Sequence, residues 1–205
     1  SELFNHLTGY ARPATYRKLV VAPDFLRPTI IERIKEQAAL GPDGHILLKA
    51  NHIVDTEVIN ELYAASDAGC PVDLIVRGNC SVRPGVPGLS DTITVRSIVG
   101  RFLEHSRIYR FGTAGPDAVY YIGSADMMQR NLNNRVEALV PVTDPLLKLR
   151  LEEILQTALS DDVLAWESRP DGTWTKVEPE RGIDTHQQLL DLATARARGE
   201  VPYPS

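Results

Sequence analysis

Short apolar runs alternate with longer stretches of helical periodicity through the first part of the chain. The runs cover residues 18–22, 46–50 and 72–77. The first run is continuous and contains β-branched residues, which is typical of a strand buried on both faces. Between the runs, apolar positions recur at helical spacing over 30–38 and 58–63, and either Asp55 or Thr56 can cap the second helix. This β-α-β-α-β order favours a parallel sheet with covering helices.

A loop rich in proline and glycine over 79–91 separates this region from a second series of strands. These strands are predicted at residues 92–97, 107–111, 119–122 and 135–142. Asp144 followed by Pro145 is a good helix start, and apolar periodicity continues that helix to Leu159. The last predicted elements are a hairpin over 162–178 and a surface helix over 185–198.

The whole pattern predicts one α/β domain with a mixed, mostly parallel sheet and helices on both faces. Residues 1–17 have few periodic apolar positions, so we interpret them as a linker or the tail of a preceding domain. The main domain is expected over 18–162. Residues 163–205 then add a hairpin, a surface helix and a tail to the same domain.

The composition is that of an ordinary globular protein, with 43% hydrophobic and 24% charged residues among 205. A formal net charge of −5 gives no overall positive field, which argues against nucleic acid as a partner. A polyanion would therefore need a local cluster of Arg and Lys. The chain contains no apolar run near the ~20 residues of a membrane span, and no glycine-rich nucleotide-binding loop.

Arg77 is a candidate phosphate ligand because it ends a predicted strand, where the loops of an α/β sheet converge. Gly78 follows it and allows a sharp turn of the backbone. The planar guanidinium group suits bidentate binding of phosphate oxygens. An arginine paired with a nearby carboxylate is an equally good interpretation of this position alone.

A second group of candidates lies on two predicted neighbouring strands. His105 and Arg107 share one face of a strand, since side chains alternate with a period of two. Ser124 and Asp126 follow the next strand in a Gly-Ser turn. An imidazole titrates near pH 6.5 and can act as nucleophile, acid or base. Together these four side chains predict a phosphate pocket, whereas a lone histidine is usually structural or exposed.

Other polar residues give weaker signals. Lys49 and Asn51 stand at the end of a predicted strand, and Arg130 with Asn131 follows the Gly-Ser turn. Each could reach a phosphate, and each is equally well explained as the solvated end of a strand or helix. Four histidines lack supporting neighbours in the sequence and are interpreted as structural or exposed. They are His6, His45, His52 and His186.

The pair His105-x-Arg107 followed by Gly-Ser-Ala-Asp at 123–126 is similar to the phospholipase D motif, His-x-Lys with a later Gly-Ser-x-Asn. The two departures argue against an ordinary phospholipase or nuclease. They resemble instead the final phospholipase D-like domain of the polyphosphate kinase family. The stretches that carry this resemblance are 47–55, 62–66, 74–78, 97–105, 123–126 and 133–137. They span most of residues 18–162.

The resemblance implies reversible transfer of the terminal phosphate of ATP to polyphosphate, with Mg²⁺, through a phosphohistidine. It assigns the ATP-contacting arginine to Arg77 and a second active-site histidine to His105. Arg107 and Ser124 would contact phosphate, and Glu104 or Asp126 would partner His105. The phosphorylated histidine and the arginines that hold magnesium belong to the preceding domain in this family. We therefore expect no metal site in these residues.

The implied partners are ATP or ADP, inorganic polyphosphate, the preceding domains of the same chain and further copies in a homo-oligomer. We expect a cytoplasmic protein, and membrane association of the full-length enzyme stays open. Two alternatives are kept. A non-catalytic nucleotide or polyphosphate-binding module would bind without transfer of a label. A phospholipase D-like phosphodiesterase or nuclease, with one histidine motif from each of two chains, would cleave a diester.

Overall fold

The computed structural model describes residues 18–202, so the predicted linker over 1–17 lies outside the described residues. One sheet of nine strands forms the centre, in the order β1-β7-β6-β5-β2-β3-β4-β8-β9. The strands are β1 (Val20–Val21), β2 (Ile46–Ala50), β3 (Val72–Val76), β4 (Ile93–Ile98), β5 (Ile108–Phe111), β6 (Val119–Gly123), β7 (Ala138–Val142), β8 (Ala165–Ser168) and β9 (Trp174–Lys176). The helices are α2 (Leu26–Ala39), α3 (Thr56–Asp67), α4 (Gln129–Asn134), α5 (Pro145–Ser160) and α6 (Thr185–Ala197), with a 3₁₀ turn, η1 (Gly41–Asp43).

The sheet is mixed, as predicted, but it is not mostly parallel. Among the described strands only β2–β3 and β3–β4 are parallel neighbours, and every other neighbouring pair is antiparallel. The β-α-β pattern that favoured a parallel sheet holds for the β2-α3-β3 unit. Strands β5, β6 and β7 are neighbours in sequence and space, and they run antiparallel. A short connection such as that between β5 and β6 joins antiparallel strands.

The prediction of a strand buried on both faces at residues 18–22 is wrong. Only Val20–Val21 form a strand, β1, which lies at the edge of the sheet and pairs antiparallel with β7. The side chain of Val20 is half-buried and that of Val21 is buried. An edge strand has a neighbour on one side only, and an apolar run does not reveal that position.

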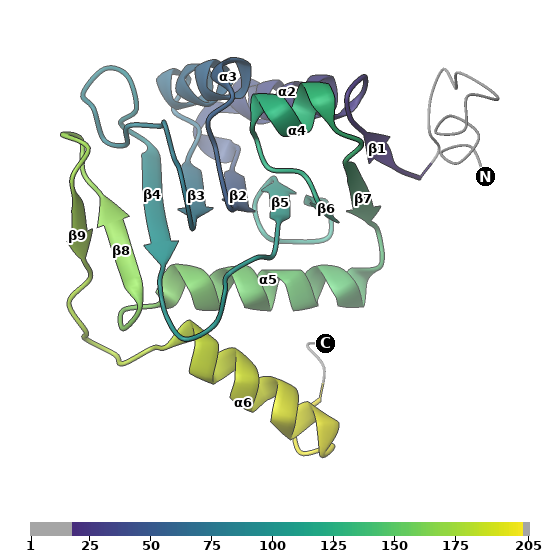
Figure 1. The fold of residues 1–205 in the computed structure, drawn as a ribbon, viewed down its shortest axis with the longest axis vertical. Coiled ribbons are helices and arrows are strands. Elements are labelled where there is room, and N and C mark those ends of the chain that lie inside the picture. The colour runs from purple at the N-terminus through teal and green to yellow at the C-terminus, as the bar shows by residue number, and fades with distance from the viewer. Residues whose placement is uncertain (1–17, 203–205) are drawn as a thin grey trace.

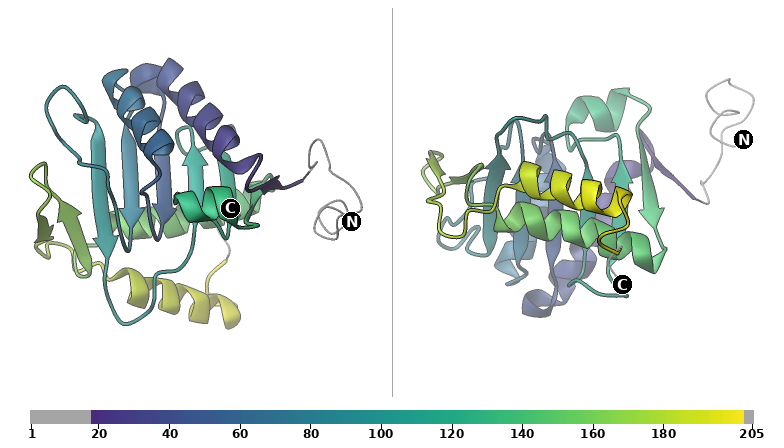
Figure 2. Two further views of the ribbon diagram at one scale, coloured as in Figure 1. Left: turned by 45° about the horizontal axis from the view of Figure 1, so that its top comes forward. Right: turned by 90° about the horizontal axis from the view of Figure 1, so that it is seen from below.

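Helices cover both faces of the sheet, as predicted (Figure 1). On one face, α2 and α3 contribute Ile30 and Leu62 to a core that also contains Leu48 of β2. On the other face, Leu155 of α5 packs in a smaller core with Leu47. The alternation along β2 therefore sends successive side chains into different cores. Helix α6 packs against α5, and Figure 2 shows the two lying side by side across that face.

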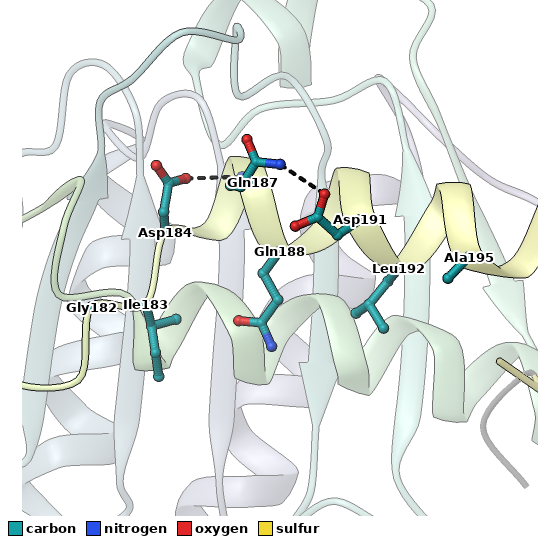
Figure 3. Close-up of a pocket in the computed structure, with 8 residues that line it drawn as sticks. All are labelled: Gly182, Ile183, Asp184, Gln187, Gln188, Asp191, Leu192 and Ala195. Atoms are coloured by element: carbon teal, nitrogen blue, oxygen red, sulfur yellow. Dashed lines mark hydrogen bonds between the residues drawn. The ribbon is translucent and has the colours of Figure 1, made fainter. Parts of the chain in front are cut away.

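Local capping rules account for several helix starts. Asp144 accepts hydrogen bonds from the backbone N–H groups of Leu146 and Leu147 at the start of α5, which confirms the predicted cap. Of the two caps considered for α3, the structure selects Asp55, whose Oδ1 lies 3.2 Å from the nitrogen of Val58. Asp184 caps α6 in the same way, as Figure 3 shows.

The carboxyl-terminal segment is joined to the rest by both a sheet edge and a buried carboxylate. Strand β8 pairs with β4 and starts the predicted hairpin with β9. The Asp162 carboxylate accepts backbone N–H groups from residues 180–183. These hydrogen bonds, led by that from Arg181, lower the pKa of Asp162 to about 2. The domain boundary placed at residue 162 stays a prediction.

Candidate phosphate-binding site

A polar cavity of about 230 Å³ opens where several strands end or begin. Its lining residues are Asn51, His52, Arg77, His105, Arg107, Ser124, Asp126, Met128, Arg130, Asn131, Arg135 and Glu137. Strands β2 and β3 are parallel, so the residues after them meet at one edge of the sheet. Strand β5 runs antiparallel to β2 and therefore begins at that same edge, and β6 returns to it. The lining carries more cations than carboxylates, as an anion-binding site requires.

Asp126 organises the centre of this cavity. Its two carboxylate oxygens accept a bidentate pair of hydrogen bonds from Arg107, at 3.1 Å from Nε and 3.0 Å from Nη2. The backbone N–H groups of Asn51 and His52 also donate to Asp126, at 2.8 and 3.2 Å. Burial alone would raise the pKa of this carboxyl, but the hydrogen bonds from Arg107 and the backbone outweigh it and hold the pKa of Asp126 below its usual range. Asp126 is therefore an ionised acceptor that fixes Arg107.

Arg107 in turn lies beside His105. Its Nη1 donates to the carbonyl oxygen of His105 at 3.0 Å and lies 3.5 Å from the ring Nδ1. A guanidinium has no acceptor, so Nδ1 faces it with its lone pair. Within residues 18–202, Nε2 of His105 has no hydrogen-bond partner. This leaves one ring nitrogen of an exposed imidazole for a ligand in the cavity.

Arg77 and Asn51 supply cavity donors that have no partner among residues 18–202. Nε of Arg77 donates to Oδ1 of Asn51 at 3.0 Å, and Arg77 forms no ion pair with any carboxylate in the described part of the chain. Asn51 is only 1% exposed, yet its Nδ2 has no hydrogen-bond partner among the described residues. An unpaired buried donor costs about 1–3 kcal/mol. A ligand oxygen in the cavity would remove that cost.

Two glycines allow the close approach of these segments. A Cβ on Gly78 would lie 2.5 Å from Cε1 of His52, and one on Gly123 would lie 2.1 Å from the carbonyl oxygen of Ala138. Any other residue would push the ends of β3 and β6 away from their neighbours. Ser124, next to Gly123, accepts a hydrogen bond from the backbone of Ala138 at 3.2 Å, and its hydroxyl proton remains free to turn into the cavity.

Comparison with known proteins identifies the architecture. The family model described as polyphosphate kinase C-terminal domain 2 matches residues 19–188. The chain belongs to the polyphosphate kinase family. A polyphosphate kinase from Thermosynechococcus vestitus is 53% identical over 198 residues, which cover 93% of this chain and 27% of that relative. The chain thus spans about a quarter of the length of the curated relatives it matches.

Solved structures support the same family and the fold. The crystal structure of polyphosphate kinase from Porphyromonas gingivalis superposes with a TM-score of 0.87 at 35% identity, covering 97% of this chain and 31% of that one. Nuc from Salmonella typhimurium, a phospholipase D family member, gives a TM-score of 0.55 at 15% identity, covering 74% and 97%. At that identity the likeness shows the fold alone, and it confirms the predicted phospholipase D-like architecture.

Most of the residues singled out from the sequence meet in this cavity. Those that line it are Arg77, His105, Arg107, Ser124, Asn51, Asp126 and Arg130. Lys49 and Glu104 do not line it. They form an ion pair with each other outside the cavity, on the side of α5 and α6, where Glu104 is also hydrogen-bonded to His186. Asp126 is bonded to Arg107, and no hydrogen bond joins it to His105 within residues 18–202.

Four residues that line the cavity were not singled out from the sequence: His52, Met128, Arg135 and Glu137. His52 was interpreted as structural or exposed, but its Nδ1 accepts the backbone N–H of Asn79 at 2.9 Å and its ring lines the cavity. Glu137 accepts a hydrogen bond from Asn131 at 2.8 Å. Asn131 belongs to α4, a six-residue helix too short to show a helical period. The resemblance over 133–137 was the available signal for Arg135 and Glu137.

The cavity does not offer a ligand set for magnesium, the ion implied by the family resemblance. Its two carboxylates are bonded to Arg107 and Asn131, and Mg²⁺ prefers free carboxylate oxygens in octahedral geometry. No group of three or more His, Cys, Asp and Glu side chains that could hold a metal ion occurs in the described residues.

None of the helices over 18–202 is both long and apolar enough to cross a membrane.

Proposed function

We propose that this chain provides the nucleotide- and phosphate-binding half of a polyphosphate kinase active site. That enzyme would transfer the terminal phosphate of ATP reversibly to polyphosphate through a phosphohistidine that lies outside this chain. The observation that carries the proposal is the unpaired Nδ2 of Asn51, buried in the wall of a cavity beside Arg77 and His105. A buried donor without a protein partner, among arginines, is what a phosphate oxygen would complete.

The side chains of the cavity suit phosphoryl transfer, which requires positioned positive charge more than covalent chemistry from the protein. The terminal nitrogens of Arg77 would bind the nucleotide phosphates, with Nδ2 of Asn51 donating to a neighbouring oxygen. Arg107, held by Asp126, would stabilise charge on the transferred group. Nε2 of His105 would exchange a proton with the oxygen that leaves or attacks. Ser124 and Arg130 would contact oxygens at the rim of the cavity.

The remaining parts of the reaction belong to segments beyond this chain. The chain is about a quarter as long as its curated relatives, so a nucleophile and magnesium ligands would come from the rest of a longer enzyme. Magnesium would enter with the nucleotide and would not be held by these residues. We place the enzyme in the cytoplasm as a homo-oligomer, with ATP, ADP and inorganic polyphosphate as its partners.

Arg77→Ala in the longer polyphosphate kinase tests the proposal. Transfer of labelled terminal phosphate from ATP into polyphosphate should fall at least about tenfold, because a charge-assisted donor to the transition state is lost. Arg169→Ala is the matched control, since it removes an exposed arginine of the hairpin turn outside the cavity. Equal rates in the two variants would remove Arg77 from the site. Cleavage of a phosphodiester, without transfer to polyphosphate, would support the phospholipase D-like alternative instead.

A further inference from the structure

The two residues that flank His105 are bound by one buried ammonium group. Lys49, which is 3% exposed, donates from Nζ to the Glu104 carboxylate and, at 2.9 Å, to Oγ of Ser106. Lys49 lies on β2, with its side chain on the face of the sheet that α5 covers. The residues immediately before and after His105 are therefore both attached to strand β2 through Lys49.

His186, in the first turn of α6, binds the same loop through both of its ring nitrogens. Its Nε2 lies 3.0 Å from Oε1 of Glu104, and its Nδ1 accepts the backbone N–H of Phe102 at 3.2 Å. Because Nδ1 accepts a hydrogen bond, the ring proton is on Nε2, which then donates to Glu104. His186 is 7% exposed, and its ring also contacts the Phe102 ring, with centroids 5.5 Å apart.

The loop packs directly on this imidazole. A Cβ on Gly100 would lie 2.8 Å from Nδ1 of His186, so the backbone at residue 100 touches the ring. The side chains of Val99 and Leu103 in the same loop do not anchor it, since they are 59% and 68% exposed. Figure 1 shows the β4–β5 connection passing beside the first turn of α6. Leu164 also touches the loop at Gly100, and His186 and Glu104 add the side-chain hydrogen bonds that hold it.

We propose that His186 is a positioning residue for the phosphoryl-transfer site. It acts through Glu104, together with Lys49, and holds the β4–β5 loop so that Nε2 of His105 faces the cavity. The inference rests on the proposed role of His105. It gives α6 a place in the active site although none of its residues lines the cavity. Geometry at this level matters because a misplacement of about 1 Å can cost 100-fold in rate.

His186→Ala in the longer polyphosphate kinase tests the inference. We expect turnover to fall about 10- to 100-fold, because the loop no longer holds the His105 ring in its position at the cavity. The KM for ATP should stay within about threefold, since Arg77 and Asn51 do not contact the loop anchor. His186→Gln should recover most of the rate, because its amide N–H can donate to Glu104. His186→Asn should recover less, since its shorter amide reaches only the Phe102 backbone.

The matched control lies on the same helix. Asp191→Ala removes the exposed hydrogen bond from Gln187, 2.7 Å long, on the side of α6 that points away from α5 (Figure 3). It should leave turnover unchanged. Backbone amide exchange gives a direct readout of the anchor. The Phe102 amide should exchange faster in His186→Ala than in Asp191→Ala, while the amides of β2 keep their protection.

The outcomes separate this inference from the proposed function. If His105→Ala lowers turnover and His186→Ala does not, the positioning role is wrong and the site stands. If His105→Ala keeps the wild-type rate, the site itself is wrong and the inference falls with it. Equal losses of ATP affinity and turnover in His186→Ala, without recovery in His186→Gln, would show a general structural defect and overturn the positioning role.

Discussion

Two clusters of charged residues lie on either side of His105, and they differ in how their hydrogen-bonding groups are used. On the cavity side, Nδ2 of Asn51 and the terminal nitrogens of Arg77 have no protein partner within residues 18–202. On the side of the β4–β5 loop that faces α5 and α6, the polar groups of Lys49, Glu104 and His186 form a second cluster, the loop anchor. They are bonded to one another or to the backbone. Both clusters look alike in sequence, as polar residues at strand ends and in loops.

The difference separates two functions of buried charge. Groups that pair within the protein fix geometry, and removing one partner leaves another buried and uncompensated. Groups left unpaired in a cavity reduce stability and are retained where a ligand completes them. We therefore expect substitutions of Lys49, Glu104 or His186 to reduce stability and turnover together. Substitutions of the unpaired cavity groups should reduce ligand binding with little change in stability.

The largest expected effect is the loss of stability caused by Lys49→Met, in the cluster with Glu104 and His186. This change leaves the Glu104 carboxylate without its ammonium partner, so the free energy of unfolding should fall by about 3 kcal/mol. Urea unfolding measures it. The double variant Lys49→Met/Glu104→Gln should regain part of the loss, because the uncompensated carboxylate is gone. A double variant no more stable than the single one would contradict pairing as the cause.

A smaller effect, confined to binding, is expected from Asn51→Asp in the cavity. The new carboxylate keeps an acceptor for Arg77 but replaces the unpaired donor with a negative oxygen. Tripolyphosphate should bind about tenfold more weakly in calorimetry, because a hydrogen bond to a charged oxygen is worth about 1.5 kcal/mol or more. Asn60→Asp makes the same charge change on the exposed side of α3 and is the control. Equal affinities in both variants would mean that Asn51 does not face the ligand.

The smallest effect concerns acid stability and tests the carboxylate that holds Arg107. The pKa of Asp126 is lowered in the folded protein, so its contribution to stability is present above the ordinary value of 3.8. That contribution is lost as the pH falls through the lowered folded pKa. The free energy of unfolding should therefore decrease more steeply with acid in the wild type than in Asp126→Asn. Parallel pH profiles would show that the Arg107 pair does not stabilise the fold.

Local rules predicted much of the fold because they depend on neighbours in sequence. Asp144 with Pro145 gave the start of α5, and the hairpin and α6 were placed near their observed bounds. The prediction of a mostly parallel sheet was wrong, because strand pairing is decided between segments far apart in the chain. The apolar run at 18–22 could not show that β1 is an edge strand.

The site was predicted in part for the same reason. The prediction that His105 and Arg107 lie on one face of a strand is wrong, because β5 begins only at Ile108 and both residues precede it in the β4–β5 loop. They still meet Ser124 and Asp126, which follow β6, because β5 and β6 pair as neighbours. His186 lies more than eighty residues from Glu104, and nothing around it in the sequence indicates that contact. His52 was passed over because its neighbour Asn79 joins it only through the parallel pairing of β2 and β3.

Titration of the chain with tripolyphosphate, followed by NMR of assigned side-chain signals, tests whether the cavity binds phosphate. We expect saturable shifts of the Asn51 side-chain amide and the His105 ring, with the signals of His186 nearly unchanged. Arg77→Ala should weaken these shifts. Shifts that saturate at His186 and leave Asn51 unmoved would contradict the account, as would the absence of saturable binding at the cavity.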